Sequence, residues 1–248
     1  MPHDTVEIHV KVEIWSDVVC PWCYIGKRRF ESALARFPHR DEVDVEWKSF
    51  ELDPGAEPTH ELRGTHAEQL ATKLGRSRDQ IEQLLDQVTT TAAGEGLDFR
   101  FDLNRGGNSF DAHRLLHLAK AHGCQDQLKE RLDRGTFVEG LAVSDHEELT
   151  ALAVEVGLDE VEVRAGLASD RFADDVRADE TQARAYRISG VPFFVIDGKY
   201  GVSGAQPADL FLQGLNQAWA ERLPLTPLVT GGPATSGDVS CEGDSCAV

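Results

Sequence analysis

Two cysteines stand between a strand and a helix near the start of the chain, and this order constrains the fold more than any other feature. Residues 6–15, VEIHVKVEIW, alternate apolar and charged or polar side chains and are rich in β-branched residues, which predicts a strand. After Cys20 and Cys23 the segment YIGKRRFESALARF has helical spacing, and Pro21 suits a first helical turn. Residues 41–52, DEVDVEWKSFEL, alternate again. The chain therefore opens with a β-α-β unit whose helix begins at the dithiol.

The middle of the chain, residues 60–187, has helical periodicity almost throughout. Its clearest apolar stripe has the i, i+3, i+4, i+7 spacing of a half-buried helix. The residues of that stripe are Ala112, Leu115, Leu116 and Ala119. Glycines that follow the periodic segments predict helix ends. They are Gly94, Gly123, Gly140 and Gly157. We expect an all-helical domain here.

Residues 188–223 return to a sheet. GVPFFVIDGKYGVSG predicts two strands joined by the turn Asp197-Gly198, and AQPADLFLQGLNQAWAERL predicts a final helix. Residues 224–248 are rich in Pro, Gly, Ser and Thr, which predicts a flexible C-terminal tail. The predicted organisation is thus an α/β domain in two parts, 1–59 and 188–223, interrupted by the helical domain and followed by the tail.

Composition excludes several classes of partner. The chain of 248 residues has a formal net charge of −18, which repels nucleic-acid phosphates and anionic lipid headgroups. The sequence has no export signal and no stretch of roughly 18 apolar residues, so we expect a soluble, cytoplasmic protein. Five cysteines are too few for a disulfide scaffold of this size. In a reducing compartment such a pair is catalytic, redox-sensing or metal-binding rather than structural.

The chemistry of the pair follows from its position. A free thiol has a pKa of about 8.5, yet only the thiolate attacks a disulfide. At Cys20 the positive end of the helix favours the anion, so Cys20 is the predicted nucleophile. Cys23, one turn later, is placed to attack the mixed disulfide formed at Cys20 and to release the reduced substrate.

Several segments carry a resemblance to a known family. Cys20-Pro-Trp-Cys23 after a strand and SGVPFF at 189–194 before the hairpin are similar to the thioredoxin superfamily, in its DsbA-like branch. WKSFELDP, NSFDAHRLLHLA and VSGAQPADLF resemble the cytosolic FrnE-like dithiol-disulfide isomerases, across nearly the whole chain. The resemblance implies an α/β, thioredoxin-like fold with an inserted all-helical domain. It implies a protein disulfide oxidoreductase/isomerase that acts on a disulfide-containing protein or a small thiol substrate.

The resemblance also implies roles for the residues around the dithiol. A cis peptide bond at Val191-Pro192 would face the dithiol, and both residues would bind an extended substrate. Pro21 and Trp22 would modulate the active site. Strongly oxidising relatives often place a histidine beside the second cysteine, so this chain is predicted to be a weaker oxidant that rests as the dithiol. We expect no cofactor beyond the redox-active disulfide, with glutathione as a candidate co-substrate.

The tail holds a second pair, Cys241 and Cys246. A flexible linker of about 17 residues spans roughly 23 Å, enough to bring these thiols to Cys20. One hypothesis is a redox relay, in which Glu242 and Asp244 disfavour the tail thiolates and limit indiscriminate attack. The alternatives are an exposed pair without catalytic consequence and a metal-binding pair.

Metal binding at the main pair is also weighed. Cys-x-x-Cys is half of many zinc sites, but no second half completes a set of four ligands, so we expect no metal. His113 and His117, one helical turn apart, are expected to face the groove or solvent. Cys124 is expected to pack, and the acidic helices are interpreted as a solvated surface.

Two other functions remain open. One is a glutathione-dependent isomerase or transferase, because 2-hydroxychromene-2-carboxylate isomerases and kappa-class glutathione transferases are similar in plan. They generally carry serine where this chain has Cys20, and a serine cannot form a mixed disulfide. The other is a client-binding chaperone that holds extended chains beside Pro192 without electron transfer.

Overall fold

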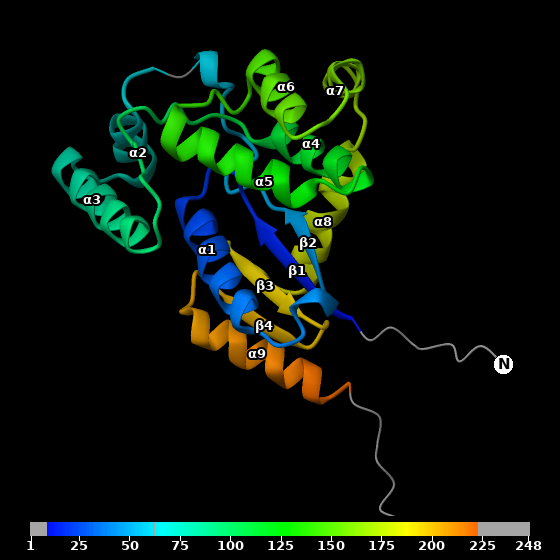
Figure 1. Cartoon of the computed structure of the whole chain (residues 1–248). Coiled ribbons are helices and arrows are strands. Elements are labelled where there is room, and N and C mark those ends of the chain that lie inside the picture. The colour runs from blue at the N-terminus through cyan, green and yellow to red at the C-terminus, as the bar shows by residue number, and fades with distance from the viewer. Residues whose placement is uncertain (1–8, 62, 223–248) are drawn as a thin grey trace, which may run out of the picture.

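A mixed four-stranded sheet forms the base of the molecule. The computed structural model describes residues 9–61 and 63–222, and Figure 1 shows their arrangement. The strands are β1 (Val10–Ser16), β2 (Val43–Ser49), β3 (Phe193–Ile196) and β4 (Tyr200–Ser203). Their order is β2-β1-β3-β4, with β2 parallel to β1 and the β3-β4 hairpin antiparallel. Residues far apart in the sequence therefore meet on the central strand β1.

One face of the sheet is covered by α1 (Pro21–Arg36) and α9 (Ala208–Ala220), which contact each other. Phe30 of α1 packs against Phe194 of β3 and Phe211 of α9, with ring centroids 5.6 and 5.8 Å apart. Burying each phenylalanine contributes about 1.5–3 kcal/mol. This packing fixes the direction of α1 over the sheet, and with it the position of the dithiol at its start.

The helical domain lies between β2 and β3 in the sequence. Figure 1 shows α4 to α7 gathered beyond the ends of β1 and β2, with α2 and α3 beside α1. The helices are α2 (His66–Leu74), α3 (Arg78–Gly94), α4 (Phe110–Ala121), α5 (Gln125–Arg134), α6 (His146–Glu155), α7 (Glu160–Leu167) and α8 (Ala173–Ala185). Short helical turns are η1 (Arg40–Glu42), η2 (Thr59–Glu61) and η3 (Gly135–Glu139). The α/β class predicted from the sequence is confirmed.

Residues with a left-handed backbone stand next to two of the helix boundaries. Helix α8 begins only at Ala173, because Phe172 before it adopts a left-handed conformation with φ 64°. The helix end predicted at Gly94 is confirmed, because Gly94 is the last residue of α3, and the chain then turns at Gly96 with φ 77°. Within residues 9–61 and 63–222, no helix has both the length and the apolar character of a membrane span.

Candidate active site

Cys20 caps the start of α1, directly after the turn that follows β1. Its backbone is extended, with φ −96° and ψ 112°, and its N–H donates to the carbonyl of Asp17 at 3.2 Å. No side chain caps this helix start, and its first turn carries no acidic residue. The positive end of the helix is therefore not neutralised by a carboxylate of its own first turn, which favours a negative charge at Cys20.

The two cysteines differ in burial. Cys20 is 4% exposed, whereas Cys23 is completely buried, and both are thiols. Burial raises the pKa of Cys23 well above its usual value, and the hydrogen bond and charge of Cys20 add to this effect. Lys129, on α5, acts in the opposite direction. Cys23 is thus held as a thiol beneath Cys20, which has the narrow opening to solvent.

Val191 and Pro192 lie beside this pair. The thiol of Cys20 donates to the carbonyl of Val191, with Sγ 3.6 Å from the oxygen. The Val191-Pro192 peptide bond is cis. The carbonyl of Pro192 in turn accepts from the N–H of Gly204 at 2.8 Å, just after β4. The structure therefore brings together four residues that the sequence singled out, from segments about 170 positions apart in the chain.

The residues between the cysteines occupy different positions. Pro21 is the first residue of α1, where its missing N–H costs no helical hydrogen bond. Trp22 is 38% exposed, and Leu52, which donates its N–H to Asp17 at 2.7 Å, is 46% exposed. Large apolar side chains are thus exposed close to the dithiol, where they can contact a substrate.

A buried carboxylate behind Cys20 was not anticipated from the sequence. Asp17 is fully buried, and it accepts from the N–H groups of Val19 and Leu52. Its Oδ1 lies 3.4 Å from Nε2 of His113, which is also fully buried. Burial would raise the pKa of Asp17, but the neighbouring His113 and the N–H of Leu52 outweigh this and lower it. Asp17 therefore joins the cysteine turn to α4.

The expectation that His113 and His117 face the groove or solvent is wrong. His113 is 0% and His117 is 8% exposed. His117 lies 3.1 Å from the hydroxyl of Ser49 and 3.2 Å from Asp179. Each histidine has a carboxylate partner from a distant segment, and polar partners of this kind are what permit burial. Both histidines lie next to the apolar stripe of α4 in the sequence, and this position could have indicated that they are buried.

The remaining candidate residues lie elsewhere. Cys124 precedes α5, is partly buried and packs against the core of the helical domain. Cys241 and Cys246 lie outside the described residues. Among the residues that the structure describes, no group of three or more His, Cys, Asp or Glu could hold a metal ion.

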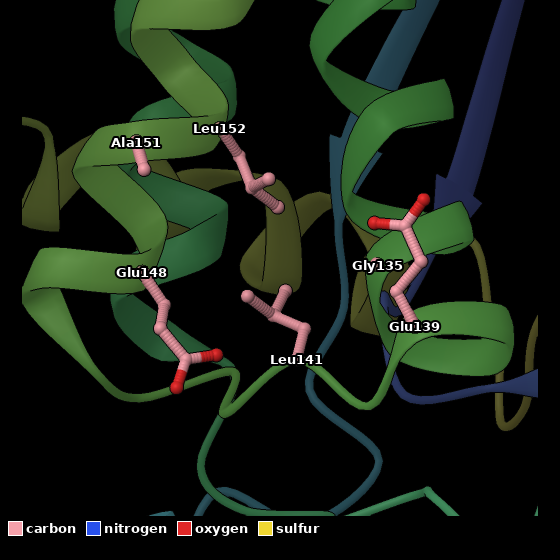
Figure 2. A pocket seen from close by; sticks show the side chains of 6 residues that line it. All are labelled: Gly135, Glu139, Leu141, Glu148, Ala151 and Leu152. Atoms are coloured by element: carbon pink, nitrogen blue, oxygen red, sulfur yellow. The ribbon is translucent and has the colours of Figure 1, made fainter.

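Among the cavities of the described residues, two lie in the helical domain and its connections. The smaller, of about 190 Å³, is shown in Figure 2, where Glu139 and Glu148 flank Leu141. The larger, of about 510 Å³, is lined by polar residues that include Asn108, Asp111 and His146. Neither is lined by Cys20 or Cys23.

Comparison with known proteins agrees with this arrangement. A probable DsbA oxidoreductase from Streptomyces coelicolor is 49% identical in sequence and superposes with a TM-score of 0.82, over 92% of this chain and 98% of the other. The uncharacterized protein YwbO of Bacillus subtilis is 29% identical over 84% of this chain and 96% of its own length. A 2-hydroxychromene-2-carboxylate isomerase shares the fold, with a TM-score of 0.62 and 17% identity, over 86% of this chain and 96% of the other. The DSBA-like thioredoxin domain model matches residues 11–216, and the chain belongs to this family.

Proposed function

We propose that the protein is a thiol-disulfide oxidoreductase that reduces or isomerises disulfides in the cytosol through Cys20 and Cys23. The observation that supports this most directly is the pairing of a capping cysteine, at an unneutralised helix start, with a fully buried cysteine one turn later. A nucleophile and a resolving thiol need this difference in access. The 49% identical oxidoreductase supports the same chemistry.

The reaction has two exchange steps. The Cys20 thiolate attacks one sulfur of the substrate disulfide, forms a mixed disulfide and releases the first substrate thiolate. Cys23 then loses its proton and attacks Sγ of Cys20, so that the Cys20-Cys23 disulfide forms and the second substrate thiolate leaves. Two electrons pass from the protein to the substrate. Isomerisation uses the first step alone, when a substrate thiol displaces Cys20.

Val191 and Pro192 are proposed to bind the substrate next to the attacked disulfide. The carbonyl of Val191 already faces Cys20 Sγ, so a chain laid across this point would have its disulfide within reach of the nucleophile. Trp22 and Leu52 supply exposed apolar surface nearby. An extended polypeptide suits such a surface because main-chain pairing and apolar contact act together.

The residues between the cysteines support a reducing or isomerising direction. Neither Pro21 nor Trp22 carries a charge that would stabilise the Cys20 thiolate. A less stable thiolate lowers the reduction potential, which makes the Cys20-Cys23 dithiol a better electron donor to substrate disulfides. Glutathione is the proposed donor that returns the disulfide to this state.

Insulin reduction with glutathione, combined with a redox titration of Cys20-Cys23, tests the proposal. The wild type should reduce insulin, and Cys20→Ser should lose this activity. A potential as high as that of a strong periplasmic oxidant would exclude the reducing role. Full activity in Cys20→Ser would favour a glutathione-dependent isomerase or transferase, and client binding without electron transfer would favour a chaperone.

A further inference from the structure

The helix α5 contains two charged residues that are completely buried. Lys129 and Asp133 are each 0% exposed, and they form an ion pair one helical turn apart. Lysine and aspartate are almost never fully buried, because both lose their hydration. An apolar pair of the same volume would serve packing equally well. The pair therefore calls for an explanation other than stability.

The surroundings of α5 place this pair against the start of α1. Tyr24 donates its hydroxyl hydrogen to Glu130 at 2.7 Å, and its ring stacks on Phe137 with centroids 6.3 Å apart. One turn further along α1, Lys27 Nζ lies 3.2 Å from Asp126. The two helices therefore run antiparallel where they touch, because a later residue of α1 contacts an earlier residue of α5. By this register Cys23, which precedes Tyr24, lies at the level of Glu130 and of the turn of α5 that follows it.

The ring of Trp47, on β2, provides a second observation on where Lys129 lies. The ammonium groups of Lys27 and Lys129 lie 5.8 and 5.1 Å from the centroid of its ring. Lys27 follows Cys23 by one turn on α1, and both side chains are buried. Lys129 therefore lies near the buried side chains of α1, and its positive charge acts on the Cys23 thiol, whose pKa it lowers.

The second exchange step requires a proton acceptor close to Cys23. Cys23 must lose its proton before it can attack Cys20, yet it is completely buried, and burial raises its pKa well above the usual value. Bulk water cannot accept the proton from a thiol without an opening to solvent. A group inside the protein must take it.

We propose that Lys129 and Asp133 form the proton-accepting pair for Cys23. This inference rests on the proposed dithiol exchange and assigns its second step. The Cys23 proton passes to Lys129 as Lys129 passes one of its own to Asp133. Lys129 keeps its positive charge beside the new thiolate, Asp133 becomes the neutral acid, and the Cys23 thiolate displaces the substrate thiolate from Cys20. The acceptor is thus supplied by the helical domain, not by the sheet that carries the cysteines.

The titration of Asp133 suits this role. Burial raises its pKa to about 6, while the charges of Lys129 and Lys27 oppose the rise and Glu130 adds to it. At neutral pH the carboxylate is the main form and is ready to accept a proton. Because acceptance requires the carboxylate, the rate of the second step should rise as the pH increases through about 6.

Rapid mixing of the reduced protein with an aryl disulfide that releases a coloured thiolate separates the two steps. The first release reports attack by Cys20, and the second reports attack by Cys23. In the double variant Lys129→Met, Asp133→Leu, which buries no charge, the first phase should be unchanged. The second should slow by about 100-fold or more at pH 7 and lose its rise near pH 6. The single variant Asp133→Glu keeps both the lysine and a carboxylate, so its second phase should be much faster than that of the double variant.

The control is a charged pair on the other side of the same helix. Arg131 pairs with Glu155 of α6, and Arg131→Met with Glu155→Leu should leave both phases unchanged. A normal first phase with an unaltered second phase in the Lys129, Asp133 variant would overturn this inference alone. A wild-type second phase without a rise near pH 6 would overturn it without any variant. Absence of the first phase in the wild type would overturn the proposed function itself.

Discussion

Gly26 of α1 lies directly against Pro192, so that a β-carbon on Gly26 would lie 2.9 Å from Pro192 Cγ. This contact sets how closely the dithiol helix approaches the proline segment. Real Cβ contacts are essentially never shorter than 3.0 Å, and Pro192 is held by the hydrogen bond from Gly204. A side chain at position 26 must therefore push the two segments apart.

Gly26→Ala should lower both stability and turnover. Overpacking of this kind costs about 1–3 kcal/mol, and displacement of Pro192 from Cys20 should reduce kcat/KM for insulin. Gly166→Ala is the control, because Gly166 is also helical and has no atom within 4 Å of the added carbon. That variant should gain about 0.5–1 kcal/mol. Urea unfolding and insulin reduction measure the two effects, and equal behaviour of the two variants would disprove the contact.

The two cysteines should react with an alkylating agent in a fixed order. At pH 7 iodoacetamide should modify Cys20 first, because burial keeps Cys23 inaccessible and raises its pKa. Mass spectrometry of the digested protein gives the order of labelling. Cys124, which is partly buried and whose pKa burial also raises, is the internal reference. Labelling of Cys23 ahead of Cys20 would contradict the assigned roles.

The motifs predicted the dithiol and the proline because spacing and neighbours in the sequence identify them. Cys20, Cys23 and Pro192 each stand at a boundary between predicted elements, so their meeting follows from the topology. The division at 59/60 and 187/188 into two domains stays a prediction.

Lys129 and Asp133 could not be found in this way. In the sequence they form an ordinary i, i+4 pair on a highly charged helix, which is typical of a solvated surface. Their burial arises only from the packing of α5 on α1 and β2, which is a tertiary effect. Asp17 and His113 are separated by 96 positions, so their pairing could not be predicted from the sequence either.

Asp17→Asn should destabilise the protein in a pH-dependent manner. The pKa of Asp17 is lowered in the folded protein, so its charged form stabilises the fold at pH values above the unfolded pKa, near 3.8. Asparagine removes the charge that faces His113 and accepts from the N–H groups of Val19 and Leu52, which costs about 1–3 kcal/mol at neutral pH. As the pH falls below 3.8 toward the lower folded pKa, the difference from wild type should shrink. Urea unfolding at a series of pH values gives this difference.

Glu42→Gln is the comparison for Asp17→Asn. Glu42 lies 3.8 Å from His39 as Asp17 lies near His113, but both of these side chains are exposed. Its loss should cost only about 0–1 kcal/mol. A difference between wild type and Asp17→Asn that does not change with pH would show that Asp17 acts through its backbone hydrogen bonds alone.

The tail pair is the last element to test. Under the relay hypothesis, Cys241 and Cys246 exchange with Cys20-Cys23, so replacing both with serine should slow glutathione-dependent insulin reduction several-fold. The single-turnover first phase at Cys20 should not change, because it needs no second pair. Ser236→Ala and Ser240→Ala together provide a control in the same segment. Unchanged turnover after loss of both tail thiols would exclude the relay and leave Cys20-Cys23 to accept electrons directly from glutathione.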